Sequence, residues 1–228
     1  MYAKSLDISI KAQGPHHPSV ASTYNDMAVV YELQGKFDKA LALHIKSLDI
    51  DIEFHGPDHS SIATAYTNMA VVYSRQGKHE KALELYKKSL TIDVKVYGLN
   101  HPEVAATLNN MANLYHMQEK YDEALELHTQ SLGVYLKMHG PDHPSVAAAY
   151  NNMAVVFNAQ GKHDQALELH RRSLDIDLKF LGPHHPCVAS TYDNMVAVFD
   201  AQGKHEEARA LWEKVDLLRK LEAMKRLS

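Results

Sequence analysis

The sequence contains a single cysteine, Cys187, so no disulfide can form within the chain. It also lacks the uninterrupted run of about 18 apolar residues that a transmembrane helix requires. No charged segment followed by an apolar one stands at Met1, as a secretory signal would have. Together these absences favour a soluble protein of a reducing, cytoplasmic compartment.

The chain also has no large excess of charge of one sign. It contains 24 lysines and arginines and 28 aspartates and glutamates, which gives a formal net charge of -4. No block of basic residues stands out, so neither nucleic acid nor a membrane surface is an expected partner. The chain has no phosphate-binding glycine loop and no nucleophile elbow. We therefore expect a protein that is not an enzyme and that needs no cofactor.

The same residue types return along the chain at intervals of 42 residues. A period of 42 residues is typical of solenoid proteins. Cys187 replaces the serine found at its place in most copies, which favours a tolerated variant over a nucleophile. The residues that return at this interval are Gly14, Gly56, Gly98, Gly140 and Gly182, then Met27, Met69, Met111, Met153 and Met195, and Ala40, Ala82, Ala124, Ala166 and Ala208.

The period predicts one elongated array without an internal domain boundary. Residues 1–13 align with the end of a repeat, so the chain begins in mid-repeat with a second helix that lacks its partner. We expect Met1 to mark a cut within a longer array, or else a natural half-repeat. The predicted units are the partial repeat 1–13 and the repeats 14–55, 56–97, 98–139, 140–181 and 182–228, the last with an extended terminal helix.

Each repeat predicts two amphipathic helices separated by a tight turn. In the first full repeat, apolar residues at helical spacing mark a helix over 18–33, a glycine closes it, and a second helix covers 37–55. Gly56 and the proline after it end the second helix. Glu119 replaces the turn glycine in the third repeat, and we expect strain of about 1 kcal/mol if it takes a positive φ.

Two stretches, QGKFDKALALH and QEKYDEALELH, resemble the tetratricopeptide repeat. The 42-residue unit, with its GPxHPxVA loop and YNNMA helix, looks most like the repeats of kinesin light chains. The resemblance covers the chain from residue 1 to about residue 222. It implies an all-α fold, a right-handed superhelical α-solenoid of helix-turn-helix repeats, in which the first helix of each repeat lines a concave groove. It further implies a non-catalytic scaffold that binds a protein or peptide partner in that groove.

The resemblance places the groove on the first helices, where asparagine recurs from repeat to repeat. Asparagine costs roughly half a kcal/mol against alanine inside a helix, so its recurrence asks for a reason. A side-chain amide offers a donor and an acceptor together, as the backbone of an extended peptide requires. Carried onto this chain, the expected groove residues are Asn25, Asp26, Thr67, Asn68, Arg75, Asn109, Asn110, Asn113, His116, Asn151, Asn152, Asn158, Asp193 and Asn194.

A structural role is the alternative for one member of each adjacent pair, which would bond to the neighbouring repeat and fix the stacking. This interpretation applies to Asp26, Asn68, Asn110, Asn152 and Asn194. Exposure and ligand contact are expected instead for Asn25, Asn109 and Asn151.

Arg75 is the only cation expected in the groove, so the clamp by which some tetratricopeptide domains hold a C-terminal carboxylate is not expected here. A neutral or basic partner is favoured by four acids on the first helices, Asp26, Glu32, Asp193 and Asp200. Two other interpretations stay open. The repeats could form an array that self-associates head to tail, or they could be the sensor or cargo-binding arm of a larger signalling or motor protein.

Histidine is unusually frequent, with 16 residues. Imidazole ligates metals and titrates near neutral pH, which suggests a metal site or a pH sensor. Members of each series lie at least one repeat apart, so we expect capping or surface roles and no metal site. The series are His17, His59, His101, His143 and His185 in the loops, His79, His163 and His205 in the turns, and His44, His128 and His170 in the second helices.

Overall fold

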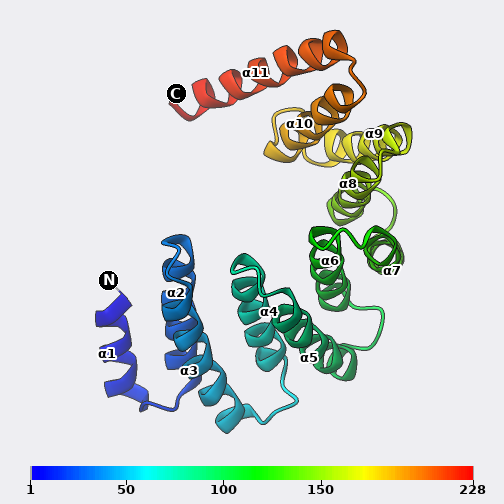
Figure 1. Cartoon of the computed structure of the whole chain (residues 1–228). Helices are drawn as coiled ribbons and strands as arrows, with labels where there is room; N and C mark the ends of the chain where they lie inside the picture. The colour runs from blue at the N-terminus through cyan, green and yellow to red at the C-terminus, as the bar shows by residue number, and fades with distance from the viewer. Residues whose placement is uncertain (1, 228) are drawn as a thin grey trace. The chain divides into compact units, whose positions relative to one another are not determined.

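The computed structural model describes residues 2–227, without the side chains of residues 2, 3, 5, 218 and 221–227. The described residues form eleven helices and no strand, which confirms the expected all-α class (Figure 1). The helices are α1 (Tyr2–Gln13), α2 (Pro18–Leu33), α3 (Phe37–His55), α4 (Ser60–Arg75), α5 (His79–Tyr97), α6 (Pro102–Met117), α7 (Tyr121–His139), α8 (Pro144–Ala159), α9 (His163–Phe180), α10 (Pro186–Ala201) and α11 (His205–Leu227).

The helix ends fall where the sequence predicts them. The expected helices over 18–33 and 37–55 are confirmed as α2 and α3. Pro18 occupies the first turn of α2, where its missing N–H is not needed. Gly56 ends α3 with a φ of 83°, a conformation that is open to glycine and costly for other residues.

The loop histidines cap the helices that follow them. The Nδ1 atoms of His17 and His59 accept hydrogen bonds of 3.2 Å from the backbone N–H groups of Ser19 and Ser61. An N-cap is normally a short acceptor such as serine or aspartate, and the imidazole ring takes that role here. The same contact is made by His101, His143 and His185.

The chain forms two compact units, residues 1–110 and residues 111–228, and the division between them falls inside α6. In the first unit α1 lies against α2, which packs on α3, and α4 packs on both α3 and α5 (Figure 1). In the second unit α7 contacts α8, which packs on α9, and α10 packs on both α9 and α11. Each unit is therefore a stack of helical hairpins.

Fully buried alanines stand at the centres of both stacks. Ala28 and Ala40 belong to the core of the first unit, and Ala154 and Ala166 hold the same places in the second. Because the separation of packed helices depends on the side chains at their contact, alanine at these places allows a close approach. The recurring alanines of the sequence thus set the spacing within the hairpins.

Replacing Ala40 with leucine should lower the free energy of unfolding by about 1–3 kcal/mol, because a filled core has no room for the added atoms. Ala42→Leu, on the exposed side of the same helix, is the control and should change stability by no more than about 0.5 kcal/mol. Urea unfolding followed by circular dichroism measures both. Equal effects of the two substitutions would contradict the spacing role of Ala40.

Glu119 has a φ of 60°, so the positive φ expected at this turn is confirmed. Glu119→Gly should raise the free energy of unfolding by about 0.5–1 kcal/mol, because the relief of left-handed strain exceeds the entropy cost of glycine. The reverse change, Gly161→Glu, should lower it by a similar amount, since nothing lies within 4 Å of an added Cβ at that φ of 74°. Thermal unfolding of both variants tests the two predictions. Unfolding temperatures that shift in the same direction would rule out strain as the cause.

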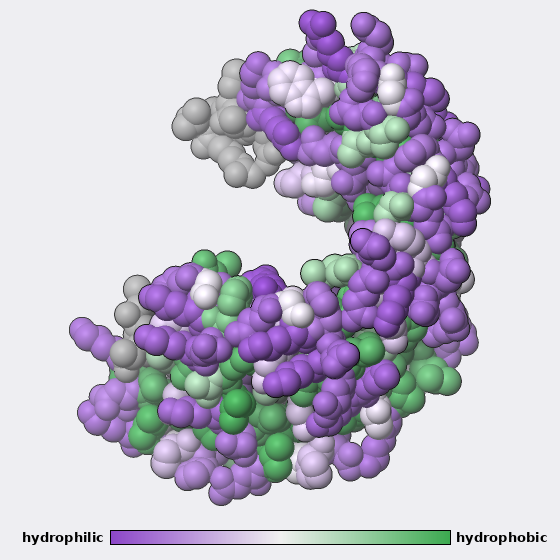
Figure 2. Space-filling model, viewed as in Figure 1, coloured by the Kyte–Doolittle hydropathy of each residue, from purple (hydrophilic) through white to green (hydrophobic). Residues whose placement is uncertain are grey.

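The helices combine buried residues with exposed ones. Figure 2 shows hydrophilic side chains over most of the visible face, with smaller hydrophobic areas between them. This is the pattern of helices that bury one stripe against their neighbours. In the described part of the chain, no helix combines the length and the apolar character that a membrane crossing needs.

Candidate functional site

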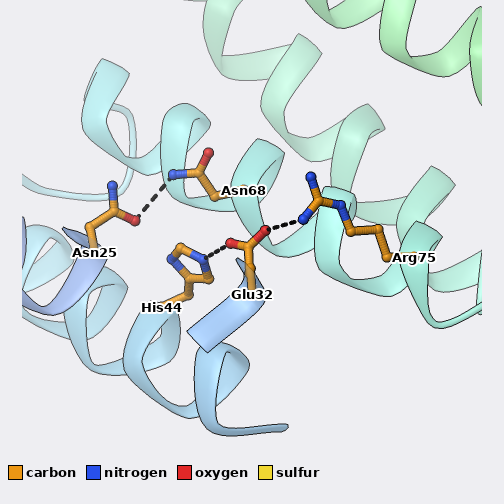
Figure 3. A network of polar contacts seen from close by, with 5 residues as sticks. All are labelled: Asn25, Glu32, His44, Asn68 and Arg75. Carbon is orange, nitrogen blue, oxygen red and sulfur yellow. Dashed lines mark hydrogen bonds and ion pairs between the residues drawn. The ribbon is translucent and has the colours of Figure 1, made fainter. Parts of the chain in front are cut away.

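Asparagine side chains join successive first helices. In the first unit, Nδ2 of Asn68 on α4 donates a hydrogen bond of 3.1 Å to Oδ1 of Asn25 on α2 (Figure 3). In the second unit, Nδ2 of Asn194 on α10 donates one of 3.3 Å to Oδ1 of Asn151 on α8. Asn68 and Asn194 thus make the stacking contact that was the alternative interpretation for them.

The bonded asparagines keep hydrogen-bonding capacity beyond the stacking contact. An amide has two hydrogens and two acceptor lone pairs, and the bond uses one hydrogen of Asn68 and one lone pair of Asn25. All four asparagines are half-buried rather than enclosed. Asn151 is the more heavily used, because Nδ1 of the buried His170 also contacts its Oδ1. The remaining groups suit the N–H and C=O of a peptide backbone.

The other expected groove residues differ in their exposure. Three are exposed, and these are Asp26, Arg75 and Asn113. Four are half-buried on α6 and α8, and these are Asn109, Asn110, His116 and Asn152. The exposed residues are therefore the best places to detect a partner without disturbing the fold.

Thr67, Asn158 and Asp193 are half-buried and bound within the chain. The hydroxyl of Thr67 lies 2.8 Å from that of the buried Ser89. Oδ1 of Asn158 is 2.8 Å from Nδ1 of the turn residue His163, and Arg219 of α11 donates to Asp193. Any partner contact at these three positions would add to an existing intramolecular bond.

Glu32 on α2 lies at the centre of a polar network (Figure 3). Its Oε1 is 3.0 Å from Nε2 of the buried His44 on α3, and its Oε2 accepts a hydrogen bond of 3.4 Å from Nη1 of Arg75 on α4. The Glu32 side chain is only 9% exposed, because all three helices enclose it. Arg75, the cation expected in the groove, is therefore paired with an acid of the preceding repeat.

The acids that favoured a basic partner are largely engaged within the chain. Glu32 is shared between His44 and Arg75, and Asp193 accepts from Arg219. The third, Asp200, lies beside a turn histidine at 3.1 Å. Their contribution to the attraction of a cationic segment is correspondingly reduced, which leaves the exposed Asp26.

Sequence reasoning missed a buried carboxylate that adjoins the amides. Asp51 on α3 is 8% exposed and borders a cleft of about 190 Å³. Burial raises the pKa of Asp51, while His55, His59 and a hydrogen bond with Ser61 act in the opposite direction. The available signal was the recurrence of this acid among apolar second-helix residues, as Asp93 and Asp177. The cleft is lined from α2, α3 and α4 by Ser22, Asn25, Ser47, Asp51, Ser61, Thr64 and Ala65.

The equivalent carboxylate of the next repeat is satisfied by hydroxyl groups. Oδ2 of Asp93 accepts hydrogen bonds from Thr107 at 3.2 Å and from Ser89 at 3.4 Å. Thr107 stands one period after Ala65, at the same place in its repeat. The surroundings of Asp51 and Asp93 thus differ at this place, and they differ as well where Ser61 is followed one period later by Glu103.

The second-helix histidines are buried, and burial lowers the pKa of His128 and of His170 to about 4, so both are neutral at physiological pH. His116 adds to the lowering at His128. In the described part of the chain, no three histidine, cysteine or acidic side chains gather as metal ligands would. These histidines act in the core.

The stacked hairpins define a repeat protein of the α-solenoid class. The tetratricopeptide repeat family model matches five overlapping segments that together span most of the chain, and the chain belongs to this family. The matched segments are residues 1–53, 19–93, 61–137, 103–179 and 145–215.

Solved structures agree with this assignment. BtubC (BKLC) from P. vanneervenii is 23% identical over 98% of this chain and 89% of its own, with a TM-score of 0.79, a likeness of fold. A putative kinesin light chain from Podosopora anserina with nearly identical TPR-like repeats is 26% identical over 89% of this chain and 96% of its own, with a TM-score of 0.71. A single-substitution form of that protein is 25% identical over 93% and 99%, with a TM-score of 0.74. The expected likeness to kinesin light chain repeats is confirmed. A comparison with the sequences of curated proteins gave no match.

Proposed function

We propose that the chain is a scaffold that holds an extended segment of a partner protein along the amides of its first helices. Tetratricopeptide repeat proteins typically bind protein partners, and this chain belongs to that family. The observation that carries the proposal is the recurrence, in both units, of half-buried amides that stack on one another and keep spare N–H and C=O groups. Each unit offers its own row of such amides.

The partner segment is neutral or basic rather than acidic. Asp26 is exposed on α2, whereas Arg75, the cation on the described first helices α2 and α4, is already paired with Glu32. An acidic segment would meet these carboxylates without a free cation to offset them. The near-balanced charge of the chain gives no reason to propose nucleic acid or a membrane as the partner.

The test is site-specific photo-crosslinking together with peptide selection. A photoreactive residue at Asp26 or Asn113, both exposed on first helices, should crosslink to peptides selected from a random library on the intact chain. The same residue at Asp49 or Gln130, exposed on second helices, is the control and should give little crosslinking. Equal crosslinking from both sets would reject the first helices as the binding surface.

A double substitution, Asn25→Ala with Asn68→Ala, should weaken binding of the selected peptide at least tenfold, equivalent to about 1.4 kcal/mol of binding free energy. Asp49→Ala with Glu53→Ala, exposed on α3, is the matched control and should leave affinity unchanged. Circular dichroism must show equal helicity in both. Unchanged affinity in the asparagine variant would refute a role for these amides.

Self-association is a second candidate, favoured by the apolar surface of α11. Trp212 and Leu217 are more than half exposed on this helix, while Val215 between them is buried in the second unit. Sedimentation velocity over a range of concentrations would show a growing species that Trp212→Ser with Leu217→Ser abolishes. A strict monomer at the highest concentration would exclude this candidate.

A further inference from the structure

The cleft beside Asp51 presents mainly hydrogen-bond acceptors. Three of its hydroxyl groups have already donated their hydrogens to backbone carbonyl groups. These bonds run from Ser47 to Ala21 at 2.9 Å, from Ser22 to Pro18 at 3.2 Å and from Thr64 to Ser60 at 3.2 Å. Each of these oxygens still has lone pairs to offer to a ligand.

Ser61 has no spare hydrogen either. Its hydroxyl bonds to Asp51 and also lies 3.0 Å from Nδ1 of His59, which accepts the backbone N–H of Ser61. The hydrogens that remain in the lining belong to the amide of Asn25, whose oxygen accepts from Asn68. A ligand that brings only donors therefore matches the cleft, and one that brings acceptors does not.

Asp51 has no lysine or arginine partner among the residues that the structure describes. The titratable groups that act on it are the imidazoles of His55 and His59. A carboxylate taken out of water needs compensation from hydrogen bonds or opposite charge. The hydrogen bond with Ser61 supplies part of this compensation, and the open cleft leaves room for the rest.

Position 65 is one reason why Asp51 is open to a ligand while Asp93 is satisfied. Thr107 reaches Asp93 with its hydroxyl, and the threonine also occupies the space beside it. Ala65, at the equivalent place, has no hydroxyl and lines the cleft instead. The chain therefore contains both an open form of this site and a closed one. They differ by the alanine and the threonine at this place, and also by Asn25 and Ser61 of the open form, which are Thr67 and Glu103 in the closed one.

We propose that the cleft binds the ammonium group of a lysine side chain supplied by the partner segment. An ammonium group carries three donors and no acceptor, and its hydrogens point in different directions, as suits oxygens that come from three helices. The planar fork of arginine fits a carboxylate edge better than a cleft lined from several sides. The volume of about 190 Å³ admits the ammonium and its last methylene groups. The assignment of this lysine to a partner rests on the function proposed above.

Asn25 connects this cleft to the amide row. It lines the cleft and also takes part in the amide contact with Asn68 (Figure 3). A peptide held by these amides would carry a side chain past the mouth of the cleft. The site thus sets which residue of a partner segment is preferred, and the amides hold the backbone.

The test uses Nα-acetyl-lysine methylamide as the probe, titrated into the intact isotope-labelled chain. Saturable nuclear magnetic resonance shifts are expected at the methyl groups of Thr64 and Ala65, with a dissociation constant in the millimolar range, as befits so small a ligand. Asp51→Asn and Ala65→Thr should each raise the dissociation constant of the probe at least tenfold. Asp93→Asn is the matched control, and it should leave the titration unchanged because its carboxylate is already satisfied.

Four outcomes would overturn the proposal. The probe could give no saturable shift at these methyl groups, or it could bind equally well after Asp51→Asn. The matching glutamine or arginine methylamide could bind as well as the lysine probe. Sodium, potassium or magnesium chloride could produce the same saturable shift, which would make the cleft a metal site. Unfolding of each variant in urea confirms that a lost titration does not reflect a lost fold.

The two proposals fail separately. The lysine titration needs no partner, whereas the crosslinking and peptide selection do not depend on lysine. Saturable binding of the lysine probe without peptide crosslinks at the first helices would reject the proposed scaffold function and support the lysine site in the cleft. Peptides that crosslink at the first helices without any preference for lysine, together with no saturable shift from the lysine probe, would reject only the proposed lysine site.

Discussion

Acidification to about pH 4 should strongly destabilise the second unit, because two buried histidines resist protonation in the folded state. Burial lowers the pKa of His128 and of His170 to about 4 from the ordinary 6.5. In the unfolded chain the same side chains take up a proton once the pH falls below about 6.5. The unfolded state then binds more protons, so stability is lost as the pH falls from about 6.5 to about 4. The expected loss is roughly 2–3 kcal/mol for each histidine.

The chain supplies a natural replacement for these histidines. Tyr86 occupies the equivalent place in the second repeat and is buried there. His128→Tyr with His170→Tyr should therefore be accommodated near neutral pH and should remove most of the stability change between about pH 6.5 and pH 4. Urea unfolding at a series of pH values measures the change in both proteins.

Asp177 acts in the opposite direction within the same unit. Burial raises its pKa, with His185 opposing, so the folded state gains stability as the pH falls through that pKa. This contribution is present in the parent and in the tyrosine variant alike, and it cancels when their pH profiles are subtracted. If both proteins lost the same stability on acidification, the buried histidines would not be the cause.

The helices could be predicted closely because their ends are fixed by local chemistry. Pro18 suits a first helical turn, and Gly56 adopts the positive φ that ends α3. Glu119 could be singled out for the same reason, since its place in the repeat demands a turn conformation. Such features depend on a few neighbouring residues, which the sequence displays directly.

Which asparagines bond to the neighbouring repeat was harder to predict, because this depends on the offset between neighbouring repeats. The bond from Asn68 to Asn25 spans 43 residues, one more than the period, so it joins unlike members of successive pairs. The repeating pattern identifies the amides as a group. It does not say which members meet, because that follows from how far one helix is shifted along the next.

Asp51 could not be recognised from its own helix. Its neighbours in sequence place it on α3, where an acid would ordinarily face solvent. Its burial arises because residues of both α2 and α4 surround it, and α4 belongs to the next repeat. Whether the carboxylate is open or satisfied then depends in part on position 65, which lies on the following helix and does not stand out in the repeating pattern.

Glu32→Ala should be among the most destabilising polar substitutions in the first unit, with an expected cost of about 3 kcal/mol. The reason lies with His44, which is fully buried and contacts Glu32 through Nε2. Its Nδ1 already lacks a partner, so the loss of Glu32 would leave both ring nitrogens unsatisfied in the core. Glu32→Gln should cost less, because an amide at this place can still bond to the ring.

Arg75→Ala provides the contrast within the same network. Its side chain is 49% exposed, so its ion pair with Glu32 should be worth less than about 1 kcal/mol. Urea unfolding of the three variants measures the order, with Glu32→Ala lowest in stability and Arg75→Ala closest to the parent. An Arg75→Ala cost equal to that of Glu32→Ala would show that the ion pair, rather than His44, holds the network. The expected small cost makes Arg75 the member of the network that can be changed in partner-binding experiments while the fold is kept.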